Sequence, residues 1–482
     1  MRYEPTFESV DSHSIPKWYD DAKFGIFIHW GLFSVPAWAK AEGKSLTDLG
    51  DSEEGFAASM KNQPYAEWYL NTSRIAGSAT QKHHKEVYGE NFSYFDFKKE
   101  FEKTSSDVDF NVWADVFKQA GAQYVVLVTK HHDGYCLWPS EYKNPQMPEY
   151  QSKRDIVGDL TKAVRSKGMK MGLYYSGIFD WTFKKNPIDG FEGWVDHHLC
   201  SDEYCKYSVN QTYELIHRYH PSILWNDIGF PPQADLNKIF ADYYNEIPDG
   251  VINDRWRQYV LDPNKDRQEQ INGWVKRLEG ELEHGIAALL CVDGHYDYNT
   301  PEYTNTTSYK EKKWEMTRGM SMSFAFNQMD DPSSILTYPE IVRMIADVVS
   351  KNGNLLLNIG PKADGSLPEE QVRPLLQVGK WLQVNGEAIY GTRCWKHHVG
   401  KTADGKDVRF TVKPDALYIH VFTDDLPEKL QIQNLQIPEN ALVQMLGDGS
   451  YLPWQQNGAG LTISVPTVAK AEPVTVFKVI LA

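Results

Sequence analysis

The clearest pattern in the chain is a set of short apolar runs that each end in polar residues. Residues 20–31 (DDAKFGIFIHWG), 124–134 (YVVLVTKHHDG) and 169–177 (MKMGLYYSG) contain nearly continuous apolar segments. Runs of this kind are typical of strands that are buried on both faces, as in parallel sheets. A fourth run, 221–232 (PSILWNDIGFPP), delivers Asp227 before glycine and proline stop regular structure. We therefore predict parallel strands whose tips carry polar side chains.

Segments with helical spacing alternate with these strands. This repeated order of strand and helix is the pattern of a parallel α/β barrel and not of a sandwich. A long polar excursion at 40–110 interrupts the order, and loops of such length usually carry functional residues or cover a site. Helices are predicted at 112–120, 156–167, 213–219, 236–244 and 368–385, and further strands at 250–256, within 314–327 and at 353–361.

From about residue 390 the pattern changes to short runs in which apolar and polar positions alternate. Closely spaced runs of this kind, separated by Asp-Gly and Asn-Gly turn signals, are typical of an antiparallel sandwich. The predicted fold class is therefore α/β: a (β/α)8-like barrel over residues 1–388 and a C-terminal antiparallel β-sandwich domain over residues 389–482. The alternating runs are 408–413, 416–423, 429–432, 442–446, 461–465 and 474–481.

The acidic composition restricts the possible partners. The formal net charge is -15 and the isoelectric point is near 5.5, so the average surface would repel nucleic acid and anionic membranes. No segment approaches the roughly 18 uninterrupted apolar residues of a membrane span. The first residues contain no basic region followed by an apolar run, so we expect no signal peptide in this sequence. A cytoplasmic location, a periplasmic or secreted one after removal of a leader, and the oligomeric state all stay open.

Cysteine and histidine do not form the pattern of a metal site. The five cysteines are sparse and contain no C-x-x-C motif, so free thiols are expected, with pairing of Cys200 and Cys205 as the alternative. Neighbouring residues of a strand point to opposite faces. We therefore predict that His131 and His132 are one core histidine and one loop histidine. We expect no metal ion and no organic cofactor.

Asp227 lies at the tip of a predicted barrel strand, where catalytic residues of parallel barrels are found. An aspartate near a glycine can also cap the next helix or hold a turn, and the pattern leaves this alternative open. The aromatic content of 13% suits sugar binding, because flat rings pack on the apolar faces of sugars. A glycosidase with a covalent intermediate needs a second carboxyl group about 5 to 5.5 Å away. Spacing does not select this group among Asp254, Asp293, Asp297, Glu302 and Glu315.

Seven segments closely resemble the α-L-fucosidases of glycoside hydrolase family 29, in the family's order along the whole barrel. They are HWGLFSVPAW (29–38), YVVLVTKHHDGYCLWPS (124–140), LYYSGIFDW (173–181), LWNDIGFP (224–231), NDRW (253–256), WEMTRGMSMSFAFN (314–327) and NGNLLLNIGPKADG (352–365). The resemblance implies a barrel followed by a sandwich, and a retaining exo-α-L-fucosidase that needs no cofactor. Its implied substrates are fucosylated oligosaccharides or glycoconjugates with terminal α-linked fucose, hydrolysed through a covalent fucosyl-aspartate.

The family's nucleophilic aspartate corresponds to Asp227 in LWNDIGFP, and its general acid/base corresponds to Glu302, between NDRW and WEMTRG. We expect Arg255 to be the cation that keeps Asp227 ionised. The negative charge of Asp227 and apolar surroundings should raise the pKa of Glu302. The fucose contacts implied by the family are His29, Glu67, Trp68, His131, His132, Tyr174, Trp225 and Arg255.

Several alternatives stay open. The stretch 257–299 is longer than in compact members of the family, so Glu269, Glu281 and Glu283 remain candidates for the acid/base. The protein could be a retaining glycosidase for a related sugar such as galactose, or a fucose-binding protein on a catalytically decayed enzyme fold. The linkage preference and the role of the sandwich are not predicted.

Overall fold

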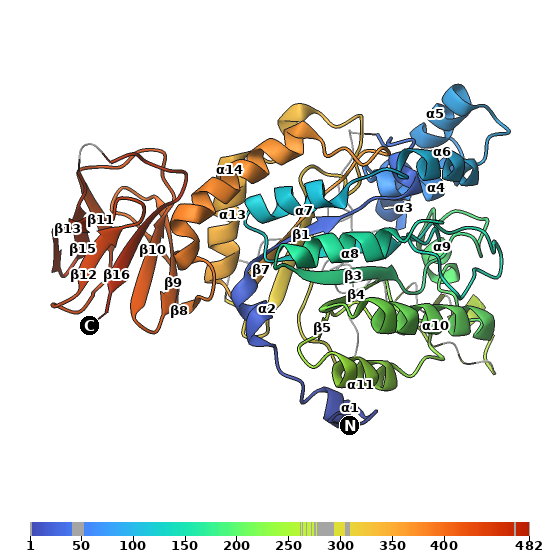
Figure 1. Cartoon of the computed structure of the whole chain (residues 1–482), viewed down its shortest axis with the longest axis horizontal. Helices are drawn as coiled ribbons and strands as arrows, with labels where there is room; N and C mark the ends of the chain where they lie inside the picture. The colour runs from blue at the N-terminus through green and yellow to red at the C-terminus, as the bar shows by residue number, and fades with distance from the viewer. Residues whose placement is uncertain are drawn as a thin grey trace.

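The chain forms an α/β part, in which helices surround a central sheet, and a β-rich part that contains the C-terminus (Figure 1). Helices α13 (Tyr338–Ser350) and α14 (Glu369–Asn385) lie between the central sheet and the β-rich part in this view. The computed structural model describes residues 2–40, 53–260, 262, 264–266, 268–270, 272, 273, 276, 294–303, 309–466 and 469–481.

The central sheet is parallel and curled. In the described part of the chain its strand order is β5-β4-β3-β2-β1-β7-β6. These strands are buried along almost their whole length, as expected for a sheet that is covered on both faces. The strands are β1 (Phe24–Ile28), β2 (Tyr124–Lys130), β3 (Lys170–Ser176), β4 (Ile223–Asp227), β5 (Val251–Ile252), β6 (Trp314–Gly319) and β7 (Gly353–Ile359).

An irregular segment at 298–302 connects the two outer strands of this sheet. Asn253, just after β5, forms a parallel bridge with Tyr298, and Asn299 forms one with Trp314 of β6. A further parallel bridge joins Glu302, at the end of the segment, to β6. The segment therefore takes the place of an eighth strand, and the predicted (β/α)8-like barrel is confirmed.

Helices cover the outside of the barrel sheet (Figure 1). Five of these helices lie where the sequence predicts a helix: α7, α8, α10, α11 and α14. Helices α9 and α13 were not predicted. The excursion after β1 contains α3 to α6, and its residues 41–52 lie outside the described part. The remaining helices are α1 (Phe7–Val10), α2 (Lys17–Ala22), α3 (Glu53–Asn62), α4 (Tyr69–Arg74), α5 (Ala79–Tyr88), α6 (Phe97–Thr104), α7 (Phe110–Gln119), α8 (Ile156–Ser166), α9 (Phe191–Asp196), α10 (Asp202–Tyr219) and α11 (Leu236–Glu246).

The β-rich part consists of antiparallel sheets, as predicted. Its described strands form one sheet in the order β13-β12-β16-β10-β9-β8 and another in the order β11-β15-β14. Side chains from both sheets, such as Ile419 and Ile463, share one apolar core. The domain division at 388/389 stays a prediction. The strands are β8 (Arg393–Lys401), β9 (Asp407–Lys413), β10 (Ala416–Val421), β11 (Lys429–Gln433), β12 (Leu442–Met445), β13 (Tyr451–Leu452), β14 (Trp454–Asn457), β15 (Gly460–Ser464) and β16 (Thr475–Ile480).

One predicted strand is shorter than expected for a physical reason. The strand at 250–256 ends after Ile252, because the side chain of Asn253 takes over the contacts to the neighbouring strand. Asn253 Oδ1 accepts the Asn226 N–H at 3.0 Å, and its amide donates to the Asn226 carbonyl at 2.8 Å. These side-chain bonds fix the end of β4, where Asp227 lies.

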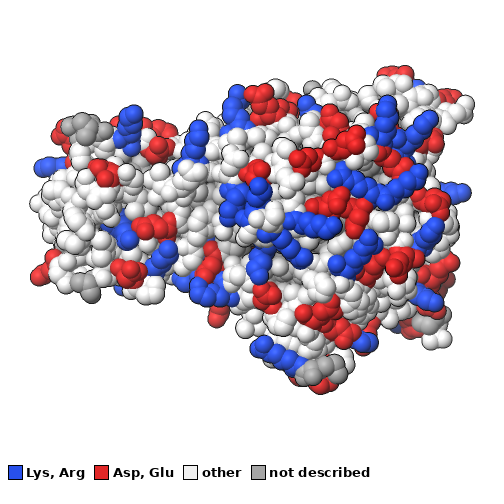
Figure 2. Space-filling model, in the orientation of Figure 1, with Lys and Arg blue, Asp and Glu red and all other residues white. Residues whose placement is uncertain are grey.

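The described surface carries charges of both signs, and the described thiols agree with the sequence analysis. Lysine and arginine lie among aspartate and glutamate over the barrel face in Figure 2, and the face of the sandwich carries fewer charged groups. Within the described ranges, no helix is both long and apolar enough to cross a bilayer. The described cysteines form no disulfide, and Cys291 lies outside the described residues. The described ones are Cys136, Cys200, Cys205 and Cys394.

Candidate active site

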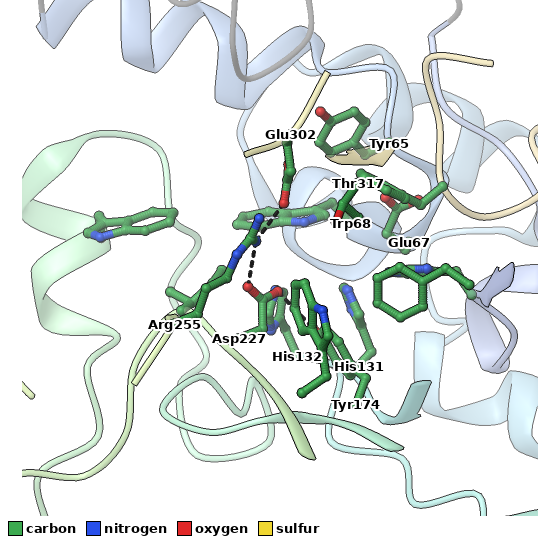
Figure 3. A pocket seen from close by; sticks show the side chains of 16 residues that line it. Tyr65, Glu67, Trp68, His131, His132, Tyr174, Asp227, Arg255, Glu302 and Thr317 are labelled. Atoms are coloured by element: carbon green, nitrogen blue, oxygen red, sulfur yellow. Dashed lines mark hydrogen bonds and ion pairs between the residues drawn. The ribbon is translucent and has the colours of Figure 1, made fainter. Parts of the chain in front are cut away.

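A pocket lies at the carboxyl ends of the barrel strands (Figure 3). Asp227 is the last residue of β4, Tyr174 lies near the end of β3, and His29 directly follows β1. All ten residues implied by the family resemblance line this one pocket, although they come from distant parts of the sequence. The lining residues are Phe27, His29, Tyr65, Glu67, Trp68, His131, His132, Tyr174, Trp194, Trp225, Asp227, Ile228, Arg255, Glu302, Thr317 and Phe324.

Asp227 accepts hydrogen bonds at both carboxylate oxygens. The Tyr174 hydroxyl donates to Oδ2 at 2.8 Å, and Arg255 Nη1 donates to Oδ1 at 2.9 Å. The following helix, α11, is capped instead by Asp235, whose carboxylate accepts the Lys238 N–H at 3.0 Å. The helix-capping alternative for Asp227 is therefore wrong. Its contacts stabilise a charged carboxylate that faces the pocket.

Arg255 joins the two candidate catalytic carboxylates (Figure 3). Its Nη1 atom lies 2.9 Å from Asp227 Oδ1 and 2.5 Å from Glu302 Oε1, so these two oxygens are at most about 5.4 Å apart. Thr300 fixes the rest of the guanidinium, because its hydroxyl oxygen accepts from Nε and its carbonyl accepts from Nη2, each at 2.8 Å. The guanidinium also lies 4.7 Å from the centre of the Trp225 ring. One anchored cation thus sets the spacing of the carboxylate pair.

The electrostatic environment differs between the members of this group. Burial raises the pKa of Glu302; the positive charge of Arg255 opposes this rise, and the negative charge of Asp227 adds to it. The predicted direction for Glu302 is confirmed. Burial alone would lower the pKa of Arg255, but the carboxylates of Glu302 and Asp227 raise it. The guanidinium therefore remains charged, and Glu302 holds a proton more readily than an exposed glutamate.

The backbone adopts unfavourable conformations directly after each of the two carboxylates. Ile228 has a φ of 60° and Tyr303 a φ of 50°, a region that residues with side chains rarely occupy. Gly229 follows with a φ of 104°, and a Cβ there would lie 2.5 Å from the carbonyl oxygen of Arg257. Such conformations cost on the order of 1–3 kcal/mol each and persist where the surroundings hold them, often at functional sites.

Hydrogen bonds behind the pocket fix the protonation state of His29. Its Nδ1 lies 2.6 Å from Asn358 Oδ1, and the amide nitrogen of Asn358 donates to the Phe324 carbonyl. Because an amide oxygen only accepts, His29 Nδ1 carries the hydrogen and Nε2 has a free lone pair. Burial lowers the pKa of His29 to about 3. His29 is therefore a neutral side chain that can accept a hydrogen bond in the pocket.

The same reasoning assigns His132. Its Nδ1 lies 2.7 Å from Ser176 Oγ, and the single hydroxyl hydrogen of Ser176 is donated to the Phe179 carbonyl at 2.7 Å. His132 Nδ1 therefore donates to Ser176, and its Nε2 keeps a lone pair. That Nε2 lies 3.8 Å from Asp227 Oδ2. Two acceptor atoms thus lie side by side at the nucleophile candidate, where a ligand hydroxyl can donate.

The prediction that His131 and His132 point to opposite faces is wrong. Strand β2 ends at Lys130, so the alternation of a strand no longer applies, and both histidines line the pocket. Their ring centroids are 4.1 Å apart. Burial lowers the pKa of both side chains well below the usual value. Both rings are therefore neutral near pH 7.

Glu67 is a buried carboxyl group on the short 3-10 helix at 66–68, with 2% of its surface exposed. Its Oε2 accepts the Ala325 N–H at 2.9 Å and the Ser323 hydroxyl at 3.2 Å. Burial raises the pKa of Glu67 to about 7, although these hydrogen bonds oppose the rise. The charge of this pocket residue therefore changes near neutral pH.

The other carboxylates that the sequence left open do not line this pocket in the described part of the chain. Glu315 lies below it and accepts hydrogen bonds from Trp225 and two tyrosines. Asp254 accepts the Thr300 hydroxyl and so supports the segment that carries Glu302. Glu269 is exposed. The candidates Glu281, Glu283 and Asp293 lie outside the described residues.

Sequence reasoning missed six lining residues, for which only weak signals existed. Phe27 lies two positions before His29 and shares its strand face, so period-two spacing from a known site residue would have found it. Trp194 belongs to the unpredicted helix α9. The others missed are Tyr65, Ile228, Thr317 and Phe324.

Comparison with known proteins agrees with this geometry. A family model described as Alpha-L-fucosidase matches residues 1–387. The chain belongs to the α-L-fucosidase family. It is therefore a glycoside hydrolase of the class predicted from the sequence, α-L-fucosidase (EC 3.2.1.51).

Relatives of this family resemble the chain over nearly its whole length. Rat tissue alpha-L-fucosidase is 31% identical over 474 residues, which cover 96% of this chain and 88% of that protein. Human tissue alpha-L-fucosidase is 32% identical over 478 residues, with coverage of 96% and 88%. The structure of Thermotoga maritima alpha-fucosidase with a mechanism-based inhibitor is 38% identical, covers 99% of this chain and 100% of that one, and has a TM-score of 0.83. The same enzyme in complex with fucose gives a TM-score of 0.82 at the same identity and coverage.

Proposed function

We propose that the chain is a retaining exo-α-L-fucosidase that removes terminal α-linked L-fucose by double displacement, with Asp227 as nucleophile and Glu302 as general acid/base. The observation that carries this proposal is the contact of both carboxylates with one nitrogen of Arg255, which limits their oxygens to about 5.4 Å. Retaining glycosidases hold their carboxyl groups about 5–5.5 Å apart, whereas inverting enzymes need about 6.5–9.5 Å for a water molecule.

The environment of the pair supports the order of the steps. In the first step Glu302 protonates the leaving oxygen while a carboxylate oxygen of Asp227 bonds to the anomeric carbon. The resulting ester removes the charge of Asp227, which is one cause of the raised pKa of Glu302. The pKa of Glu302 therefore falls once the ester has formed, so the carboxylate that the first step leaves at Glu302 stays ionised and accepts a proton from the attacking water. Arg255 and Tyr174 hold Asp227 throughout.

The pocket offers the groups that a sugar with several hydroxyls requires. His29 and His132 present lone pairs, and Glu67 adds a carboxylate above about pH 7. Aromatic rings such as Trp68 and Trp225 supply apolar walls for C–H faces. Hydrogen-bonded hydroxyls discriminate between sugars more strongly than a methyl group does. We infer that fucosylated oligosaccharides or glycoconjugates are the substrates.

The stereochemistry of the first product tests the mechanism. Proton NMR during hydrolysis of an aryl α-L-fucoside should show α-L-fucose before mutarotation. Initial release of β-L-fucose would overturn the retaining mechanism. Comparison of aryl fucoside with aryl galactoside separates the proposal from a galactosidase, and binding of fucosides without hydrolysis would indicate a decayed enzyme.

Azide rescue separates the roles of the two carboxylates. In Glu302→Ala, azide should replace water in the second step and give an α-fucosyl azide from an activated aryl fucoside. In Asp227→Gly, azide should occupy the position of the missing nucleophile and give a β-fucosyl azide. The exposed Glu269→Ala variant is the matched control and should behave like the wild type. Rescue with the opposite stereochemistry, or no rescue in folded variants, would contradict the assignment.

A further inference from the structure

A second buried polar cluster lies away from the pocket and joins the N-terminal segment to the barrel. The ligand atoms of His13, His295 and Asp297 all lie within 4.8 Å of one another. Their side chains are 2%, 2% and 1% exposed. Helix α1 packs against α11 (Figure 1). Helix α11 contributes Tyr244 to the cluster, and its hydroxyl lies 2.8 Å from both His295 Nε2 and Asp297 Oδ2.

The Tyr244 hydroxyl lies between two acceptor atoms of the cluster. His295 Nδ1 lies 3.1 Å from a carboxylate oxygen of Asp11, so Nδ1 carries the hydrogen of the neutral ring and Nε2 has a lone pair. The Tyr244 hydroxyl has one hydrogen, yet it faces both this lone pair and Asp297 Oδ2. When Tyr244 donates to His295 Nε2, Asp297 Oδ2 keeps the Ile252 N–H as its donor and has a further lone pair beside the Tyr244 oxygen.

We propose that His13, His295 and Asp297 bind a divalent transition-metal ion, with Zn²⁺ as the best match. Two imidazoles and one carboxylate, with the Tyr244 hydroxyl or a water in the fourth position, form a typical N/O donor set for this ion. His13 Nδ1 now lies 2.7 Å from Asp297 Oδ1. To bind the ion through Nδ1, His13 must carry its ring hydrogen on Nε2. His13 Nδ1 and Asp297 Oδ1 must also separate to about 3.3 Å, because this is the distance between two ligand atoms of a tetrahedral site with bonds of about 2.0 Å.

The surroundings have two further features of metal sites. Asp11 bonds the far nitrogen of His295, the contact that orients many metal-binding imidazoles. Asp11 and Asp297 supply negative charge, which Lys312 offsets in part. A cation would thus be attracted to the cluster.

The position of the cluster indicates a structural role. Asp297 Oδ2 also accepts the Ile252 N–H at 2.8 Å. Ile252 pairs with Leu224, near the start of β4, so the cluster lies at the end of the strands away from the pocket. The bound ion would connect His13 of the N-terminal segment to the start of the segment 298–302. This segment ends at Glu302, so the ion would anchor the element that carries the proposed acid/base without entering the reaction.

Zn²⁺ titration of tag-free protein, stripped with EDTA, tests the proposal. Calorimetry and elemental analysis should give one tightly bound Zn²⁺ per chain, and the ion should raise the melting temperature. His13→Gln and His295→Gln should weaken binding by at least tenfold, whereas His217→Gln, at a side chain that is 60% exposed, should not. Co²⁺ should give the visible absorption of a tetrahedral site in the wild type and lose it in His13→Gln.

Circular dichroism and fucoside hydrolysis show whether each variant is folded, and His13→Gln is expected to retain both properties. The proposal is overturned if the wild type binds no stoichiometric Zn²⁺, or if folded His13→Gln and His295→Gln variants bind it as tightly as the wild type. Because hydrolysis is not the readout of the ion, these outcomes are independent of the catalytic assignment.

Discussion

Replacement of Arg255 by methionine is a severe test of the proposed carboxylate pair. The change keeps an apolar side chain in the buried space but removes the charge that contacts both Asp227 and Glu302. Two oxygens at most about 5.4 Å apart then face each other without the guanidinium that contacts both. At an effective dielectric constant of about 20, two charges at this separation repel by about 3 kcal/mol, which corresponds to about two pKa units.

The sign of the effect follows from the charges. Without Arg255, the pair binds a proton more tightly, so the apparent pKa values of the pair rise. The alkaline limb of the pH profile of kcat/KM reports loss of the proton from the acid/base. This limb should move to higher pH by up to about two units. The maximum of kcat/KM should fall by about 100-fold or more, because removing one partner of a buried ion pair typically costs about 3 kcal/mol or more.

The assay is hydrolysis of an aryl α-L-fucoside from about pH 4 to pH 10, with circular dichroism as a check of folding. Arg255→Lys is the matched control, because it keeps the charge but loses the fork of donors. Its activity should fall, while its limbs should stay close to those of the wild type. If the alkaline limb of folded Arg255→Met stays in place or moves to lower pH, the assignment of the pair is refuted.

Three further predictions concern neighbouring groups. Burial raises the pKa of Glu67 to about 7, so the wild-type kcat/KM should fall as the pH drops through about 7. This ionisation should disappear in Glu67→Gln. If it persists in that variant, it belongs to a different residue. Ser176→Ala removes the hydroxyl that fixes the tautomer of His132. KM for an aryl fucoside should then rise about tenfold, the equivalent of about 1.4 kcal/mol, with a smaller change in kcat. Ser176→Thr, which keeps the hydroxyl, should restore KM. Gly229→Ala should lower the free energy of unfolding in urea by about 1–3 kcal/mol because of its positive φ and the close carbonyl of Arg257; unchanged stability would mean that the turn relaxes.

The regular parts of the fold could be predicted from the sequence because their patterns are local. The strand at 124–134 and the helix at 368–385 each follow from apolar spacing and end signals. The segment 298–302 could not be found in this way, since it has no apolar run and is held by bridges to Asn253 and to β6. Strand β8, a mostly exposed edge strand rich in charged residues and histidine, likewise lacks the apolar alternation on which the prediction depends.

The site could be predicted in part. The strand-tip position makes Asp227 a candidate. Its choice over a helix cap or turn, and the choice of Glu302, came from the family resemblance, because no local pattern links residues from two different strands. The arrangement of His131 and His132 was mispredicted from strand alternation, since the end of β2 at Lys130 is a tertiary effect. The tautomers of the pocket histidines depend on Asn358 and Ser176, contacts that only the folded chain creates.

The most direct test of the central claim is mass spectrometry after brief incubation with a 2-deoxy-2-fluoro-fucosyl fluoride, followed by peptide mapping. The fluorine slows breakdown of a covalent intermediate, so the account predicts one fucosyl adduct on the peptide that contains Asp227, and none in Asp227→Gly. An adduct on a different peptide, or no adduct in protein that still hydrolyses fucosides, would contradict the assignment of Asp227 as the nucleophile.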